Sequence, residues 1–178
     1  MALVRVEKDK FNLRSKLNEL DYGHVPYEKM PPGTVIQHVY ITATGNLTTT
    51  NSSWTDLSWS VSIAPRFSSS LMLIELSALG QQPNTATGVS CVTIYRNNVT
   101  NLGDTSSSNM GLSCVGDFSS SGGVFVTTPQ TFFVYDNPQT TSKTSYNLWG
   151  RRQSTGSGTA YCTHNSVTRT LSVKEIRQ

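Results

Sequence analysis

The chain has 178 residues and a mass of 19.5 kDa, which suffices for one domain plus a short extension but not for two full domains. Only 14% of its residues are charged, and the formal net charge of +3 is too small to indicate electrostatic binding of nucleic acid. Serine and threonine account for 47 of the 178 residues, which predicts a folded domain with a hydroxyl-rich surface.

The first 31 residues differ in composition from the rest of the chain. Residues 1–29 hold 11 of the 25 charged residues, and their apolar stretch is too short for a signal peptide, which predicts synthesis in the cytoplasm. Asp9 as N-cap, helix-forming residues at 10–22 and Gly23 as a C-terminal stop predict one short helix. Prolines at 26, 31 and 32 then predict a semi-stiff connector.

This helix is expected to dock on another protein, because an isolated helix of its length is only marginally stable in water. Its apolar stripe would enter a groove, and neighbouring cations would meet acidic residues at the rim of that groove. The docking residues so predicted are Leu13, Leu17 and Leu20 in the stripe, with Arg14 and Lys16 beside it.

From residue 34 onward the hydrophobic pattern alternates with a period of two. Residues 57–63 give the clearest strand, with four apolar residues separated by serines. Further strands are predicted at 35–42, 71–79, 89–96, 124–128, 131–136, 145–151 and 168–176. Asn97 and Asn98 are expected to form a tight turn, since asparagine tolerates positive φ. The fold class predicted for residues 32–178 is therefore mainly β, an antiparallel β-sandwich of jelly-roll type, preceded by the one short helix.

Two of these strands, 71–79 and 131–136, carry apolar residues on both faces. One sandwich core needs only one apolar face from each strand, so we expect a buried subunit interface to cover the surplus. The apolar runs in the body of the chain are far shorter than the ~20 residues of a membrane helix, so no membrane insertion is expected.

No two of the cysteines at 91, 114 and 162 form a CxxC motif, and their odd number argues against a disulfide framework. We therefore interpret Cys91, Cys114 and Cys162 as buried thiols. A zinc site of these three thiols with His164 is the alternative, although structural zinc ligands usually recur at tighter spacings. The sequence contains only three histidines and none of the common catalytic or phosphate-binding motifs, so neither an enzyme nor a cofactor is expected.

Several aromatic and basic residues stand near predicted strand ends beside polar loops. Exposed aromatic rings flanked by Asn, Asp and Arg are typical of sugar-binding surfaces, while packing inside the protein is the alternative. The arginines could contact an anionic glycan or a neighbouring subunit, or be solvated. The candidate contact residues are Trp54, Trp149, Arg151, Arg152 and Tyr161.

A series of short motifs in residues 32–178 resembles a β-sandwich module of virion proteins in tailed bacteriophages, notably marine and cyanobacterial phages. The motifs are PGTVIQ at 32–37, TTNSSWTDL at 49–57, VSIAPRFSSS at 61–70, IYRN at 94–97 with NLG at 101–103, and TLSVKEI at 170–176. The chain departs from the pattern at Leu71, where a lysine is expected. Residues 1–31 resemble the short virion-attachment leaders of such proteins.

The resemblance implies a non-catalytic, homotrimeric structural protein exposed on the virion, either a tail-fibre-like appendage or a head-decoration component. Its partners would be two further copies of itself and a capsid or tail protein. The first alternative is a receptor-binding tip that attaches to a host surface glycan. The second is a host lectin or TNF-like ligand, which would require a secretion route. A charged leader before the sandwich favours the attached accessory protein.

Overall fold

The computed structural model describes residues 26–81, 89–103, 111–116, 127–153, 159–164 and 167–178. The predicted helix at 10–22, with its docking residues, lies outside the described residues, as does the segment 124–126. The described part of the chain begins with a short 3₁₀ helix, η1 (Tyr27–Lys29), and continues almost entirely as strands.

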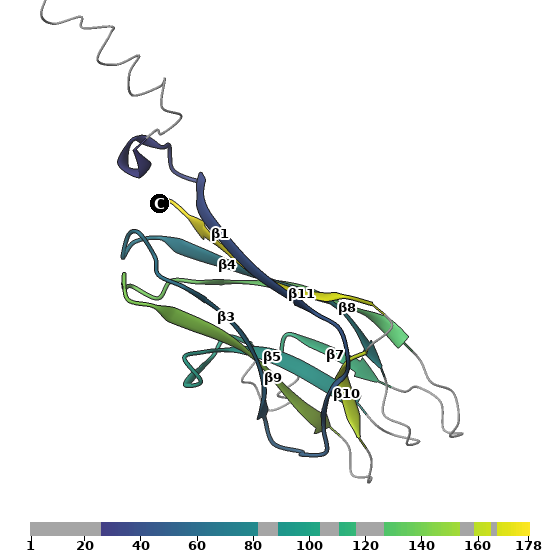
Figure 1. The fold of residues 1–178 in the computed structure, drawn as a ribbon. Helices are drawn as coiled ribbons and strands as arrows, with labels where there is room; N and C mark the ends of the chain where they lie inside the picture. The colour runs from purple at the N-terminus through teal and green to yellow at the C-terminus, as the bar shows by residue number, and fades with distance from the viewer. Residues whose placement is uncertain (1–25, 82–88, 104–110, 117–126, 154–158, 165–166) are drawn as a thin grey trace, which may run out of the picture.

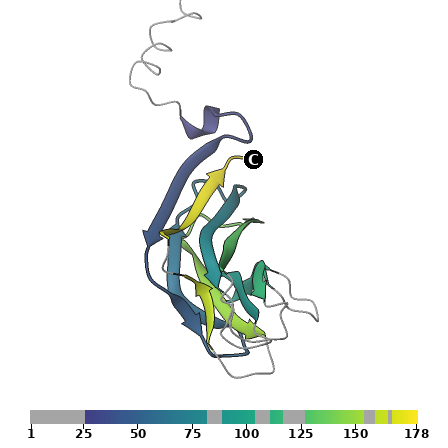
Figure 2. The ribbon, with the colours of Figure 1, turned by 90° about the vertical axis from the view of Figure 1, so that its right-hand side faces the viewer.

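The strands form two antiparallel sheets that stack face to face (Figures 1 and 2). The first sheet contains β1 (Val35–Ala43), β2 (Leu47–Thr49), β4 (Leu71–Gln81), β8 (Thr127–Asp136), β10 (Ala160–Thr163) and β11 (Arg169–Ile176). Its order is β1–β11–β4–β10–β2, with β8 also paired to β4. The prediction of a mainly β, antiparallel fold is confirmed.

The second sheet contains β3 (Thr55–Ile63), β5 (Val89–Arg96), β6 (Thr100–Asn101), β7 (Ser113–Gly116) and β9 (Thr144–Gln153). Its order is β3–β9–β5–β6, with β7 also paired to β5. The predicted strand at 89–96 coincides with β5. The strands predicted at 124–128 and 131–136 are corrected to one strand, β8, which runs through Pro129. A proline is tolerated there because β8 pairs with only one described strand.

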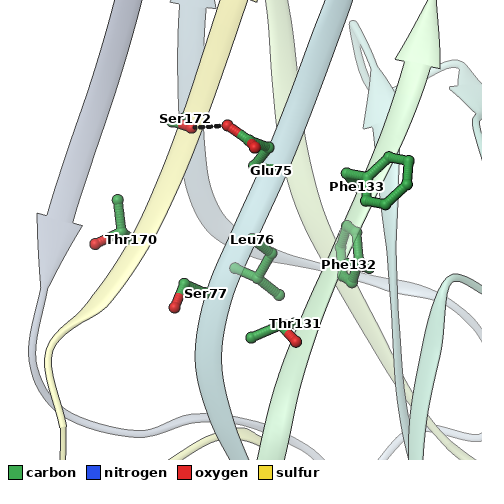
Figure 3. A pocket seen from close by; sticks show the side chains of 8 residues that line it. All are labelled: Glu75, Leu76, Ser77, Thr131, Phe132, Phe133, Thr170 and Ser172. Atoms are coloured by element: carbon green, nitrogen blue, oxygen red, sulfur yellow. Dashed lines mark hydrogen bonds between the residues drawn. The ribbon is translucent and has the colours of Figure 1, made fainter.

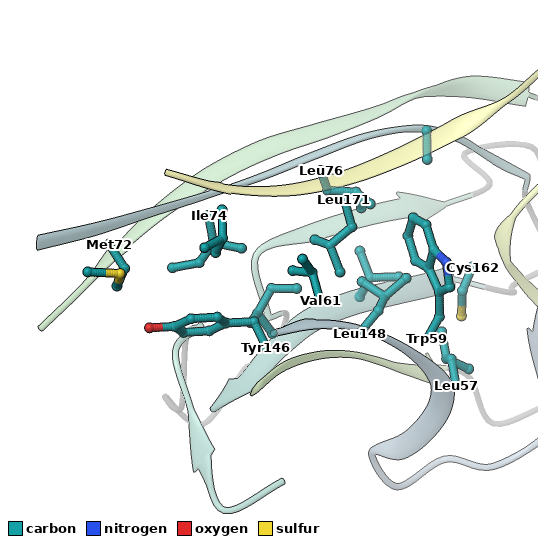
Figure 4. Close-up of a cluster of buried hydrophobic side chains, with 14 of the residues drawn as sticks. Leu57, Trp59, Val61, Met72, Ile74, Leu76, Tyr146, Leu148, Cys162 and Leu171 are labelled. Atoms are coloured by element: carbon teal, nitrogen blue, oxygen red, sulfur yellow. The ribbon is translucent and has the colours of Figure 1, made fainter. Parts of the chain in front are cut away.

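The hydrophobic core fills the space between the sheets. Leu57, Trp59, Val61 and Ile63 alternate along β3 and are all buried, as the sequence pattern predicted. Figure 4 shows Val61, Tyr146 and Leu148 of the second sheet facing Met72, Ile74, Leu76 and Leu171 of the first. Burial of each large aliphatic side chain contributes about 1.5–3 kcal/mol, so this layer is the main source of stability.

The turn predicted at Asn97 and Asn98 is confirmed. Both residues have positive φ, 52° and 58°, and the Val99 N–H closes the turn by donating to the Arg96 carbonyl at 3.0 Å. The Asn97 side chain also accepts a hydrogen bond from the Ser145 N–H at 2.8 Å, which ties the turn to β9.

A buried carboxylate organises the end of the sandwich where the chain passes from β3 to β4. Glu175 accepts hydrogen bonds from the backbone N–H groups of Arg66 and Phe67, at 2.7 and 3.2 Å, and from the Ser70 hydroxyl at 2.6 Å. The connector is joined to this same end, because the Gly33 N–H donates to the Arg177 carbonyl. At this end, η1 and the C-terminus lie close together (Figure 1).

Candidate functional surfaces

Exposed aromatic side chains gather on the outer face of the first sheet. Tyr40 of β1 is 61% exposed, and Phe133 and Tyr135 of β8 are 66% and 52% exposed. The strand register explains this grouping, because Tyr40, Ser172, Glu75 and Phe133 lie opposite one another across β1, β11, β4 and β8. The alternate residues of the same strands face the core. This sheet therefore presents large apolar side chains on both of its faces.

The centre of this outer face is a depression of about 650 Å³ (Figure 3). A charged pair lies within it: Lys174 Nζ is 2.5 Å from Glu75 Oε2, and the Ser172 hydroxyl donates to the same oxygen at 3.3 Å. Because the two charges offset each other, copies of this face would not repel one another. The residues that line the depression are Glu75, Leu76, Ser77, Thr131, Phe132, Phe133, Thr170 and Ser172.

The edge of the same sheet at β8 is also suited to association. β8 pairs with β4 in continuous register from Thr127 to Asp136, and among the described strands it has no second neighbour. An unpaired strand edge attracts other strands unless charges, prolines or bulges protect it. After Pro129, β8 has no lysine, no arginine and no register shift.

Three of the sequence-predicted contact residues meet on the outer face of the second sheet. The Tyr95 and Trp149 rings stack with centroids 4.2 Å apart and planes inclined by 25°. Trp149 Nε1 donates to Asn98 Oδ1 at 3.0 Å. The Arg151 guanidinium lies over the Trp54 ring, with Cζ 5.1 Å from the centroid. We call Trp54, Tyr95, Trp149 and Arg151 the indole platform. Tyr95 was not predicted, because its position beside Trp149 depends on the pairing of β5 with β9.

The other two predicted contact residues lie elsewhere. Arg152 alternates with Arg151 and so belongs to the inward side of β9, where its backbone N–H donates to the Asn51 carbonyl. Tyr161 belongs to β10 of the first sheet, opposite Gln81 and Thr48. The structure therefore does not bring Arg152 and Tyr161 to the indole platform.

A β-bulge shapes the edge of the platform. Asp56 lies opposite Trp149 and Trp59 opposite Leu148, so two residues of β3 are inserted between these pairs. One of them, Ser58, has a φ of 55°, and its N–H donates to Asp56 Oδ1 at 2.8 Å. Bulges of this kind re-aim side chains and are frequent next to functional sites. Here Asp56 lies opposite Trp149 at the start of the bulge, and the Ser58 N–H holds its carboxylate.

Several ionisable groups have pKa values shifted by burial. Desolvation lowers the pKa of the Arg151 and Arg169 guanidinium groups, and it raises the pKa of the Cys162 thiol to about 12. Desolvation also raises the pKa of Tyr146, with Asp136 adding to the effect. Arg169 lies over the Trp59 ring, with Cζ 4.9 Å from the centroid, and donates to the Gly45 carbonyl. The surroundings of Cys162, Tyr146 and Arg169 mark them as parts of the packed interior.

The interpretation of all three cysteines as buried thiols is wrong for two of them. Cys91 of β5 and Cys114 of β7 are joined by a disulfide, and their Cα atoms lie 4.1 Å apart. The cause is the antiparallel register, which places these residues directly opposite each other. Cys162 is a buried thiol, as predicted. In the described part of the chain, no three His, Cys, Asp or Glu residues gather as metal ligands do, so the zinc alternative has no site there.

Comparison of the chain with known proteins found no matching family model and no matching curated relative. Among the residues that the structure describes, no helix combines the length and the hydropathy needed to cross a membrane.

Proposed function

We propose that this protein is a non-catalytic structural component of a tailed-phage virion, a tail-fibre-like appendage or head decoration, made in the host cytoplasm and assembled as a homotrimer. The observation that carries the proposal is the outer face of the first sheet, where Tyr40, Phe133 and Tyr135 expose large aromatic surfaces around the neutralised Glu75–Lys174 pair. A sheet face that exposes several large aromatic side chains is typical of an interaction site.

The strand pairing supports a jelly-roll architecture, which is common in viral capsid proteins and lectins. The pairs β1–β11, β3–β9, β4–β8 and β5–β7 are all antiparallel. Along the chain they nest one inside the next, and they alternate between the first and second sheets. This is the pattern of one long antiparallel ribbon rolled into a sandwich.

The resemblance of residues 32–178 to phage virion modules supports three copies and exposure on the particle. The neutral, aromatic outer face supports a neighbouring copy of the chain as the occupant, since its offset charges would not repel a surface of that copy. Residues 1–31 would attach the trimer to a capsid or tail protein. Residue 26 lies at one end of the sandwich, so an attachment there would project the opposite end outward (Figure 1).

The test is sedimentation of the full chain and of two matched variants at micromolar concentration. We expect the wild type to sediment at three times 19.5 kDa and Phe133→Ser to sediment as a monomer. Val99→Ser removes an apolar side chain that is even more exposed, 79% against 66% for Phe133, from the turn in the second sheet and should leave the trimer intact. A wild-type monomer, or a Phe133→Ser variant that remains fully assembled, would overturn the assembly proposal. Detection of the chain in purified phage particles tests the virion assignment.

A further inference from the structure

We infer that the indole platform binds a saccharide, by stacking of a sugar ring on Trp149 and hydrogen bonding to the polar residues beside it. This site is separate from the proposed trimer face, because the platform belongs to the second sheet and the trimer face to the first. The inference therefore goes beyond the proposed function and does not depend on it.

The platform consists of aromatic surface that the core does not use. Residues 145, 147, 149 and 151 of β9 alternate with the core residues Tyr146 and Leu148, so they lie on the outer side of the sheet. The two described sheets pack on each other through their opposite, core-facing sides. Trp149 and Tyr95 are half-buried and stacked on each other, and the hydrogen bond to Asn98 fixes the indole edge. The rings are thus held in place before any ligand arrives.

Polar groups surround the rings in the arrangement that a sugar requires. Asp56 lies opposite Trp149 across the β3–β9 pair. Ser60 lies opposite Asn147, which is the next outward-facing residue of β9. Asn98, which is exposed, adds its side-chain amide at the edge of the indole, where its Oδ1 accepts from Trp149 Nε1. A sugar combines an apolar C–H face with hydroxyls around its ring. An indole beside a carboxylate, a hydroxyl and an amide matches both parts.

The charge on this face favours a saccharide over other ligands. A nucleic acid would require several cations, whereas the platform contains one, Arg151, and the acidic Asp56 lies opposite Trp149 on the neighbouring strand. A protein partner would favour a larger apolar surface, and that lies on the first sheet around Phe133. The rim of the platform is instead made of hydroxyl, amide and carboxylate groups.

The first experiment probes the full-length protein with a printed array of defined neutral and acidic oligosaccharides. We expect retention on at least one saccharide, and a soluble monovalent form of it should change the tryptophan fluorescence. Trp149 and Trp54 are half-buried and can respond, while Trp59 is buried in the core. If the folded protein is retained on no saccharide, the inference is wrong. The inference is equally wrong if the folded protein binds only a protein on the host surface.

Matched variants then locate the site. Trp149→Ala should weaken binding of the soluble saccharide at least tenfold, and Trp149→Phe, which keeps a ring against Tyr95, should weaken it less. Tyr161→Ala removes an aromatic residue that lies outside the platform and should bind like the wild type. Equal binding by wild type and folded Trp149→Ala, or a larger loss in Tyr161→Ala, would contradict the assignment. A monovalent saccharide binds one copy at a time, so its affinity does not depend on assembly and Phe133→Ser should bind it normally. Failure of assembly and failure of sugar binding are therefore distinguishable.

Discussion

The Tyr146 hydroxyl donates a 2.9 Å hydrogen bond to Asp136 Oδ2 and thereby joins β9 of one sheet to β8 of the other. Arg96 Nη1 approaches the second oxygen of the same carboxylate at 2.8 Å. Tyr146 is fully buried and Asp136 nearly so, which makes this a buried polar link between the two sheets. A buried group that loses its partner retains the cost of desolvation, so such links are sensitive to substitution.

Substitution Tyr146→Phe should therefore lower the free energy of unfolding by about 1–2 kcal/mol, because Asp136 Oδ2 loses its donor while the ring stays in place. The measurement is the midpoint of chemical denaturation at constant protein concentration. Tyr27→Phe provides the control, since Tyr27 is 37% exposed and its hydroxyl is not buried in the core. Equal midpoints for the two variants would show that the link contributes nothing.

Alkaline pH should destabilise the protein partly through Cys162. Its thiol has an ordinary pKa of 9.0, which burial raises to about 12 in the folded state. Between these values the unfolded chain loses the proton while the folded chain keeps it, so stability is retained below pH 9 and declines as the pH rises. The decline due to this group should reach about 1.4 kcal/mol per pH unit. Cys162→Ala should show a shallower decline than the wild type in denaturation curves from pH 8 to 11.

Substitution Glu175→Gln should lower the free energy of unfolding by about 2–3 kcal/mol. A glutamine offers one acceptor oxygen: if that oxygen takes the place of Oε1, which accepts from the Ser70 hydroxyl, the amide nitrogen takes the place of Oε2 and faces the donor Gln37 Nε2. Glu28→Gln is the matched control, because Glu28 is exposed in η1. Thermal or chemical unfolding of the two variants decides the matter, and similar stabilities would show that the buried carboxylate is not required.

Reduction of the Cys91–Cys114 disulfide should cost about 3 kcal/mol of stability, as expected for a bond that links residues 23 positions apart. The unfolding midpoint should fall when reductant is added, and the double variant Cys91→Ala/Cys114→Ala should lose that response. Thiol titration of the denatured, non-reduced protein should detect Cys162 alone. Three reactive thiols in that titration would contradict the disulfide.

The predicted docking stripe can be tested on the particle. The variant with Leu13, Leu17 and Leu20 changed to alanine should fold with β-rich circular dichroism but fail to enter virions. Each buried leucine contributes about 2–3 kcal/mol, so the loss of three weakens attachment by several orders of magnitude. Asn12→Ala/Asn18→Ala, which spares the apolar stripe, should enter virions normally. Normal incorporation of the leucine variant would remove the basis for the attachment role.

Local pattern accounts for much of the fold. The alternation of Leu57, Trp59, Val61 and Ile63 predicts both a strand and its buried face, and the structure has both. The short strands β2, β6, β7 and β10 escaped prediction because two to four residues are too few to show a period. Prolines usually end strands, so the sequence predicts two strands, one on each side of Pro129, where the structure has the single strand β8.

Features that depend on register could not be predicted from local pattern. Cys91 and Cys114 are separated by 23 positions, and only the pairing of β5 with β7 places them side by side. Tyr95 reaches Trp149 for the same reason, through the pairing of β5 with β9. The sequence predicted part of the indole platform from composition near strand ends. It also grouped two other residues with Trp149: Arg152, which lies on the opposite side of β9, and Tyr161, which belongs to β10 of the other sheet.

The disulfide also determines how the molecule withstands cleavage. It closes a covalent ring that contains the Asn97–Asn98 turn and β6. A protease that cuts the backbone once anywhere between Cys91 and Cys114 opens this ring but releases no fragment. The two pieces stay attached through sulfur, with β5 and β7 still held in register. A protein nicked in this stretch would therefore migrate as one intact chain until the bond is reduced.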